Sequence, residues 1–429
     1  MRLNYKRTFF TGLAFLSICA FWQMYDNVIP LMLKNTFHLG ETITGFLMGL
    51  DNILALFMLP MFGALSDKAD TRLGKRTPFI LTGTILAVIS MSFIPIANRM
   101  KNLTMFLIFL GMVLLAMGSY RSPAVALMPD ITPKPLRSKA NAIINLMGAL
   151  GGVYTLAMII LLVDKQKEDY TKVFIAVAGI MVLAVILLML TVQEKKIALE
   201  LRQSEEESNP TEDEGVVTSD QSKNGMPKEV KKSFIFILSS IFLWFFAYNA
   251  VTTAYSRYAE VVWGLKGGGF ANALLVATIA AIFSYIPIGF ISSKVGRKKT
   301  IIAGIIMMTA SYLCGALFVH YSSWVYVVFA FTGIGWAAIN VNSYPMVVEM
   351  CKGADIGKYT GVYYIFSMSS QIITPIVSGA LLEHVSYRTL FPYAVIFSAA
   401  SFCTMLFVKH GDSKPVKKKD MLENFDTQD

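Results

Sequence analysis

Two aspartates stand inside long apolar segments near the N-terminus. Asp26 lies about seven residues before the end of the first segment, and Asp51 about seven residues after the start of the second. At about 1.5 Å per residue, both are expected roughly 10 Å from the same membrane surface. Because a carboxylate removed from water is neutralised more readily, the pair could take up one H+ or Na+ and release it on rehydration. We expect Asp26 to carry the ion coupling and Asp51 to support it, with a purely structural role for both as the alternative.

Aromatic rings and amides accompany Asp26 and recur on later apolar segments. Rings offer platforms to apolar C–H faces, and amides offer hydrogen bonds to hydroxyl groups, so together they suit a sugar. Each aromatic residue taken singly is more often a packing residue than a binding residue. The candidate substrate-binding residues are Trp22, Gln23, Tyr25, Asn27, Arg121, Asn249, Trp336, Asn340 and Gln371.

Two arginines inside apolar segments allow more than one role. Arg121 is expected in the inner third of its segment, roughly 15 Å below Asp26, where it could contact an anionic substrate, contribute to a gate or reach toward the headgroups. Arg257 and Glu260 lie three residues apart near the outer end of another segment. They could pair with each other across one helical turn, or form an outer gate.

The sequence lacks the residue patterns that a metal site or an ATP-binding site requires. The four cysteines, Cys19, Cys314, Cys351 and Cys403, have no metal-ligand spacing, and the four histidines fall at segment ends or in loops. The glycine run at 267–269 is not followed by the Lys-Ser/Thr pair of a phosphate-binding loop. The sequence therefore predicts no metal site, no cofactor and no ATP-driven pump.

The composition explains what must position these residues. The chain has 429 residues, of which 55% are hydrophobic and 15% charged, and its mean hydropathy is +0.56. Apolar runs long enough to cross a hydrocarbon core of about 30 Å occur twelve times. We place them at 9–33, 44–65, 78–97, 103–128, 141–163, 173–192, 233–258, 270–292, 300–319, 322–348, 358–382 and 388–408.

The net charge of +10 is distributed unevenly between the two sides of these spans. With the N-terminus inside, 28 lysines and arginines fall on the inner side and 9 on the outer side. This bias predicts a multi-pass plasma-membrane protein with both termini cytoplasmic. The lipid bilayer accounts for the basic excess, so no nucleic-acid partner is expected.

Internal repeats indicate a duplication. The pattern P-x-V-x-x-M occurs at Pro123 and again at Pro345, 222 residues later, and Gly74-Lys75-Arg76 recurs at the same spacing as Gly296-Arg297-Lys298. In membrane proteins, such halves are typical of transporters that rock around a central site.

We therefore expect an all-α integral membrane protein with twelve transmembrane helices in two pseudo-symmetric six-helix bundles. The predicted divisions are an N-terminal bundle at 1–192, a disordered cytoplasmic linker at 193–232, a C-terminal bundle at 233–408 and a cytoplasmic tail at 409–429. The linker could alternatively serve as a regulatory docking site.

The loop after the second span carries a recognisable motif. Gly63 and Asp67 are followed by Gly74, Lys75 and Arg76, while in the second half Ser293 takes the acidic position. This pattern resembles the loop signature of the major facilitator superfamily, a family of membrane transporters. The resemblance implies a twelve-helix fold and a cytoplasmic gate formed by Asp67, Gly74, Lys75, Arg76, Asp130, Arg137 and Arg297.

Two longer segments resemble particular groups within this superfamily. SDKADTRLGKRTPFI and PAVALMPDITPKPLRSKANA are similar to segments of the sucrose transporters and of the glycoside-pentoside-hexuronide cation symporters. Sucrose transporters have an arginine two residues after the proline of the second segment, where this chain has Val125; its own arginine, Arg121, lies earlier.

The resemblance implies a monomeric symporter that couples H+ or Na+ to a sugar or glycoside, and not an enzyme. The alternatives are a symporter or exporter of another small organic solute, a membrane-embedded enzyme acting on glycans, and a receptor that binds without transport.

Overall fold

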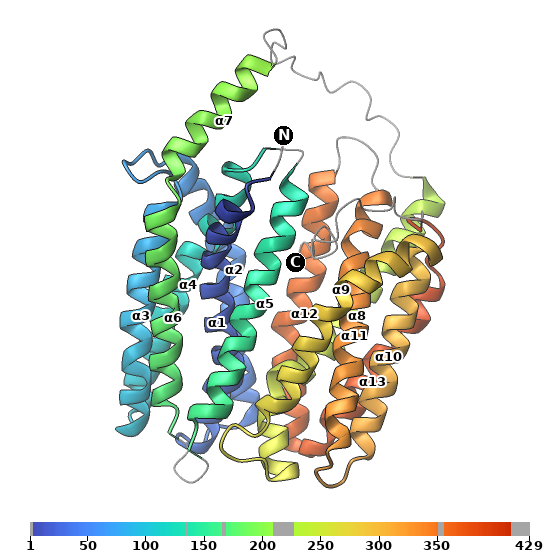
Figure 1. Ribbon diagram of the computed structural model, residues 1–429. Coiled ribbons are helices and arrows are strands. Elements are labelled where there is room, and N and C mark those ends of the chain that lie inside the picture. The colour runs from blue at the N-terminus through green and yellow to red at the C-terminus, as the bar shows by residue number, and fades with distance from the viewer. Residues whose placement is uncertain (1–2, 134–135, 165–168, 209–226, 351–355, 413–429) are drawn as a thin grey trace.

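A computed structural model describes residues 3–133, 136–164, 169–208, 227–350 and 356–412. Within these ranges every extended element of secondary structure is a helix, and twelve of the helices are long and apolar enough to cross a membrane. The helices form two bundles that stand side by side (Figure 1). The predicted fold class is therefore confirmed.

The first bundle contains α1 (Tyr5–Asn35), α2 (Glu41–Lys68), α3 (Thr77–Arg99), α4 (Leu103–Asp130), α5 (Arg137–Leu162) and α6 (Thr171–Thr191). The second contains α8 (Lys228–Trp263), α9 (Ala271–Val295), α10 (Arg297–Leu317), α11 (Trp324–Met350), α12 (Ile356–His384) and α13 (Leu390–Leu406), with a short 3-10 turn at Tyr387–Thr389 before α13.

The packing partners repeat between the bundles. Helix α1 packs on α5 and α6 as α8 packs on α12 and α13, and the α3–α4 pair corresponds to the α10–α11 pair. This equivalence is the structural form of the repeat seen in the sequence.

Local sequence signals fix several helix ends. Pro78 stands in the first turn of α3, where its missing N–H costs no hydrogen bond. Gly264 ends α8 in the left-handed conformation, with φ +66°. Gly74 and Gly296, which are equivalent in the two halves, also have positive φ values, +119° and +105°, so the repeated motif requires glycine at this position.

Two opposite faces of the molecule are used as reference below. The linker face is the end at which α1 and α3 begin, α2 and α4 end, and α7 projects; the hairpin face is the opposite end, at which α2 and α4 begin and α1 and α3 end (Figure 1). At the hairpin half of the interface, small residues of α2 pack directly on the backbone of α12. A Cβ added at Gly45 would lie 2.0 Å from the Pro375 carbonyl oxygen, and one added at Gly49 would lie 3.2 Å from that of Ile372. Such small residues let two membrane helices from different bundles approach closely.

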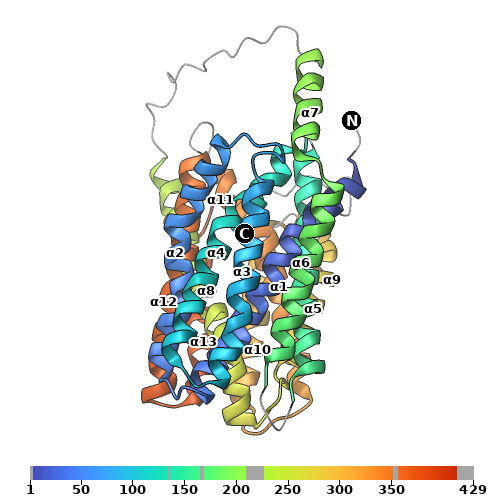
Figure 2. The same cartoon turned by 90° about the vertical axis from the view of Figure 1, so that its left-hand side faces the viewer.

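The described parts of the segment between the bundles are mostly helical, unlike the disordered linker that the sequence predicted at 193–232; residues 209–226 of that linker lie outside the described residues. Helix α7 (Glu194–Ser208) follows α6 and projects beyond the bundle, and α8 already begins at Lys228 (Figures 1 and 2). The run EKKIALELRQ consists of strong helix formers. Ile197 is buried against the first bundle, which anchors the helix. Low apolar content was therefore a poor predictor of disorder at 194–208, where the helix propensity of the sequence and the contacts of α7 with the first bundle support a helix.

Candidate functional site

A cavity of about 450 Å³, here called the central cavity, lies between the two bundles. Residues of α1 and α5 line it from the first bundle, and residues of α8, α9, α10 and α11 from the second. The predicted site residues that line it are Trp22, Gln23, Asp26, Asn27, Asn249, Trp336 and Asn340. A solute held here would contact both halves, as alternating access requires.

Several buried polar atoms of this lining have no hydrogen-bond partner within the described part of the chain. The donors are Trp22 Nε1 and Asn249 Nδ2, the acceptors are Asn27 Oδ1 and Asn340 Oδ1, and the Tyr312 hydroxyl can act as either. Since unpaired buried polar atoms are costly, they favour a ligand that both donates and accepts hydrogen bonds.

Aromatic side chains form the other component of the cavity wall. Tyr248 and Trp336 stack in parallel with ring centroids 3.7 Å apart, and both line the cavity. Trp22 faces the same cavity from the first bundle. The cavity thus combines aromatic surfaces from both halves with the amides described above.

Tyr25 does not join this lining, contrary to the prediction. It is fully buried, packs against Phe21 and Trp22, and donates a hydrogen bond to the Leu47 carbonyl at 3.3 Å. At about 100° per residue, the predicted α1 residues that line the cavity, Trp22, Gln23, Asp26 and Asn27, fall within an arc of roughly 140°, and Tyr25 falls outside that arc.

A second, smaller cavity of about 240 Å³, here called the side cavity, lies between α1, α2 and α4 of one bundle and α8 and α12 of the other. Asp26 and Asp51 both line it, together with Arg121 and Gln371. Asp51 also accepts a 2.9 Å hydrogen bond from Asn52. The two predicted coupling carboxylates therefore share one cavity, and Asp26 lines both cavities.

Arg121 is closer to Asp26 than the sequence suggested. Its guanidinium lies 5.7 Å from the centre of the Trp22 ring, and it lines the side cavity with both aspartates. Side chains lean toward the N-terminus of their own helix, and α1 and α4 begin at opposite faces, so Asp26 and Arg121 lean toward each other. The depth estimate counted only Cα positions and missed this convergence.

At the hairpin face, side chains of the two bundles contact each other. For Arg257 the sequence left open a pairing with Glu260 on its own helix or a role in an outer gate; in the structure it donates from Nε to Glu41 of α2 at 2.5 Å. Tyr387 donates to the other oxygen of Glu41, and Glu260 accepts from Asn35 across the interface at 2.8 Å. Glu41 was missed because a glutamate in a first helical turn is an ordinary feature of surface helices.

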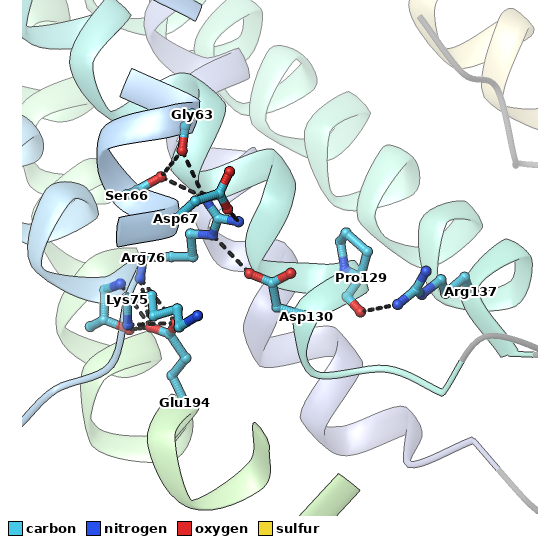
Figure 3. A network of polar contacts seen from close by, with 10 residues as sticks. Gly63, Ser66, Asp67, Lys75, Arg76, Pro129, Asp130, Arg137 and Glu194 are labelled. Carbon is cyan, nitrogen blue, oxygen red and sulfur yellow. Dashed lines mark hydrogen bonds and ion pairs between the residues drawn. The ribbon is translucent and has the colours of Figure 1, made fainter. Parts of the chain in front are cut away.

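The linker face carries a polar network within the first bundle (Figure 3). Arg76 is 6% exposed, pairs with Asp67, and donates from Nε to Asp130 at 2.7 Å. Arg76 also donates to the Gly63 carbonyl, and Arg137 donates to the Pro129 carbonyl at 2.9 Å. The motif residues thus lie together, with Arg76 at their centre.

Glu194, the first residue of α7, completes this network and was not predicted. Its carboxylate accepts the backbone N–H groups of Lys75, Arg76 and Thr77 at 2.8–3.1 Å and the Thr77 hydroxyl at 2.7 Å (Figure 3). A carboxylate at a helix N-terminus is favourable, and here it fixes both α3 and α7. In the sequence, Glu194 looked like one of many linker acids.

The second bundle repeats part of this arrangement. Arg297 pairs with Glu349 of α11, and Asp412 accepts the Lys298 N–H at 2.6 Å, as Glu194 accepts that of Arg76. Ser293, which is equivalent to Asp67, donates to the Phe290 carbonyl of its own helix. The sequence also predicts that Asp67 lies beside the start of the eleventh span, near Lys358, but the side chain of Lys358 lies outside the described part of the structure.

Comparison with known proteins agrees with this architecture. The sequence pattern of the Major Facilitator Superfamily matches residues 11–286 and again residues 268–425. An uncharacterised MFS-type transporter of Methanocaldococcus jannaschii is 22% identical over 393 residues, 90% of each chain. A sucrose transport protein of Arabidopsis thaliana is 26% identical over 137 residues, 28% of this chain and 23% of that protein.

Solved structures share the fold at low sequence identity. A POT family transporter in complex with 5-aminolevulinic acid has a TM-score of 0.69 at 10% identity and covers 94% of this chain and 95% of its own. A point mutant of the nucleoside transporter NupG has a TM-score of 0.68 at 13% identity and covers 94% and 100%. The family consists of transporters and not enzymes, so the glycan enzyme is set aside. With a pattern match over most of its length and a twelve-helix structure, the chain belongs to the major facilitator superfamily of membrane transporters.

Proposed function

We propose that this transporter is a symporter that couples the movement of H+ or Na+ to that of a sugar or glycoside. The observation that carries the proposal is the central cavity, where unpaired amide and indole groups alternate with aromatic surfaces. Hydroxyl groups both donate and accept, and sugar rings have apolar faces, so a glycoside matches both components of the wall.

The side cavity supports cation coupling. Two carboxylates there face one guanidinium, so with both ionised the three groups carry a net charge of −1. Binding of one monovalent cation, or protonation of one carboxylate, balances that charge. Arg121 attracts the carboxylates in the absence of the cation, which allows the ion to leave when the cavity is rehydrated.

The finer family assignment is part of the same proposal. Asp130, Arg137 and Asn141 match the pattern of the sucrose transporters and glycoside-pentoside-hexuronide cation symporters. The partial similarity to a sucrose transport protein points in this direction. The peptide and nucleoside transporters among the solved structures are too distant, at 10–13% identity, to indicate a substrate.

We further propose a monomer in the plasma membrane with the linker face in the cytoplasm. The excess of basic residues on that face supports this orientation, because cytoplasmic loops are enriched in lysine and arginine. Protease added to intact cells should then leave the 193–232 segment uncut. Cleavage there without permeabilisation would reverse the orientation.

The direct test is uptake into proteoliposomes. A panel of radiolabelled disaccharides and glycosides is offered under an imposed pH gradient, an imposed Na+ gradient or neither. We expect one member to accumulate above its external concentration under only one of the two gradients. If no sugar or glycoside enters under any condition, while another small organic solute does, the sugar assignment is wrong and the alternative substrate class replaces it.

A further inference from the structure

The end of α13 at the linker face carries an exposed apolar surface. The main packing partners of α13 are α8 and α10 of its own bundle. Phe407, directly after α13, is 59% exposed and stacks on Phe236 of α8 with ring centroids 5.1 Å apart. Leu406 and Ile235, their neighbours in the chain, are also exposed. In a chain that spans a membrane, such a surface is in contact with lipid chains.

Two lysines flank this end of α13, one from each neighbouring helix. Lys232 of α8 precedes Phe236 by four residues, so it lies one turn nearer the linker face on the same side of the helix. Lys298, in the first turn of α10, donates from Nζ to the Leu406 carbonyl at 3.0 Å. Because an ammonium group has three N–H donors, Lys298 can donate to a further acceptor as well. Both lysines thus lie where the apolar surface ends.

The segment after α13 brings a third lysine to the same place. The backbone N–H of Lys409 donates at 3.1 Å to the hydroxyl of Ser233, which is the neighbour of Lys232. Asp412 accepts the backbone N–H of Lys298 at 2.6 Å, so the segment is fixed to α8 and to α10. The side chain of Lys409 is exposed. Three ammonium groups from three segments therefore surround the end of α13.

The wider surface is cationic. Six lysines lie at the linker-face ends of α8, α10 and the segment after α13, against two carboxylates, Glu229 and Asp412. Arg297 and Glu349, which lie at the same face, balance each other. None of the six lysines forms an ion pair within the described residues. The six are Lys228, Lys231, Lys232, Lys298, Lys299 and Lys409. The first turns of α8 and α10 add the positive ends of two helix dipoles.

In the first bundle, the equivalent place is covered by α7. Helix α6 corresponds to α13, α1 to α8 and α3 to α10. Glu194 accepts the N–H groups at the start of α3, and Glu200 lies close enough to Arg7 of α1 for their charges to interact. The described segment after α13 offers Asp412 as the counterpart of Glu194 but no counterpart of Glu200. The lysines of α8 are therefore left to attract an anion from outside the described chain.

We propose that the linker-face end of α13 binds an anionic phospholipid of the adjacent leaflet. The lipid phosphate contacts Lys232, Lys298 and Lys409, and the acyl chains cover the Phe236–Phe407 pair. A phosphodiester presents charged acceptor oxygens that suit ammonium groups converging from several segments. The apolar surface beside the lysines favours a lipid over a free phosphate, because only the lipid removes that surface from contact with water. This site does not depend on the identity of the transported solute.

The direct test is native mass spectrometry of the purified full-length chain with phosphatidylglycerol or phosphatidylcholine. We expect the wild-type chain to retain phosphatidylglycerol at lower lipid concentration. Replacing Lys232, Lys298 and Lys409 together by Gln should weaken phosphatidylglycerol binding roughly tenfold and leave phosphatidylcholine binding unchanged, since each lysine near a lipid headgroup adds to the attraction.

The matched control removes the same charge from the C-terminal tail. Replacing Lys417, Lys418 and Lys419 by Gln should change phosphatidylglycerol binding less than twofold. If the first triple variant unfolds at a lower temperature than the wild-type chain without lipid, the double variant Lys232→Gln with Lys409→Gln replaces it, because both side chains are exposed. The double variant should weaken binding at least threefold.

A second measurement distinguishes a lipid from a free phosphate. Phe407→Trp places an indole on the apolar surface, and its fluorescence is read as the difference from the chain with its five native tryptophans. Phosphatidylglycerol with brominated chains should quench this signal more than brominated phosphatidylcholine does. Millimolar glycerol phosphate, which has the headgroup charge without the chains, should not relieve the quenching.

Three results would overturn the site. These are equal retention of the two lipids by the wild-type chain, an equal loss of phosphatidylglycerol in the tail variant and the Lys232, Lys298 and Lys409 variant, and displacement of the brominated lipid by glycerol phosphate. The first two would show unspecific attraction, and the third a phosphate site without a lipid. Because none of these measurements involves the solute or the coupling ion, the proposed function is tested separately.

Discussion

Arg257 of the second bundle and Glu41 of the first form an ion pair across the hairpin face, and their side chains are only 2% and 4% exposed. Tyr387 donates to the same carboxylate from the second bundle. Burial removes the water around both charges, so each ion is stabilised only while its partner is in contact. The ion pair can therefore exist only in the state in which the two bundles touch at the hairpin face.

Replacing Glu41 by Gln should open the hairpin face. Arg257 would then be buried without its carboxylate, a defect that costs about 3–5 kcal/mol in buried pairs. Spin labels at Met100 and Ser323, one on each bundle at this face, should show a longer distance than in the wild-type chain. Glu383→Gln, an exposed cross-bundle contact, is the matched control and should shift the distance less. The exchange Glu41→Arg with Arg257→Glu should restore the short distance; failure of this rescue would assign Glu41 a merely structural role.

Gly45→Leu should prevent the same face from closing for a steric reason. Any Cβ at this position would overlap the Pro375 carbonyl oxygen, which belongs to the backbone and cannot move aside cheaply. The spin-label distance should therefore lengthen and transport should fall. Gly179→Leu on α6 is the control, since a Cβ there meets nothing within 4 Å. Wild-type distances in Gly45→Leu would show that α2 and α12 separate without consequence.

Glu194→Gln should loosen α7 and the loop at Gly74 together. Four hydrogen bonds to a nearly buried carboxylate would weaken, for an expected loss of stability on the order of 2–3 kcal/mol. Thermal unfolding of the purified protein and the rate of proteolysis at α7 measure this loss. Glu200→Gln, on the same helix, should leave both unchanged. If the two variants behave alike, the carboxylate of Glu194 is not the anchor.

Sequence reasoning succeeded where periodicity or a repeated motif carried the information. Twelve apolar runs predicted twelve helices, and the pattern around Arg76 placed Asp67 and Asp130 in one network. It failed where two distant helices had to be positioned relative to each other. The lean of Arg121 toward Asp26 depends on opposite helix directions, and the partner of Arg257 lies 216 residues away. Tyr25 shows the same limit, since only the rotation of α1 decides which neighbour faces the cavity.

The two halves of the linker face should respond differently to matched substitutions. Asp67 is paired with Arg76 and keeps a side chain that is 63% exposed, so a carboxylate remains available to other partners during transport. Ser293 is satisfied within its own helix. Asp67→Asn should therefore reduce the initial rate of uptake several-fold more than Ser293→Ala. Equally small effects in proteoliposomes would remove Asp67 from the gate.

Asp26→Asn should separate coupling from binding. The asparagine keeps the shape of the side chain at the junction of the two cavities, but it can neither take up a proton nor balance the charge of a bound Na+. Uphill accumulation should therefore be lost, while exchange of labelled for unlabelled solute continues, because exchange requires no net release of the ion.

Asp51→Asn should also weaken accumulation, since Asp51 shares the side cavity with Asp26. The measurement compares uptake under an ion gradient with exchange at equilibrium in the same proteoliposomes. Met48→Leu, a volume-conserving change of an apolar residue that lines the same cavity, serves as the control. If both Asn variants still concentrate solute as well as the wild-type chain, the coupling ion binds elsewhere.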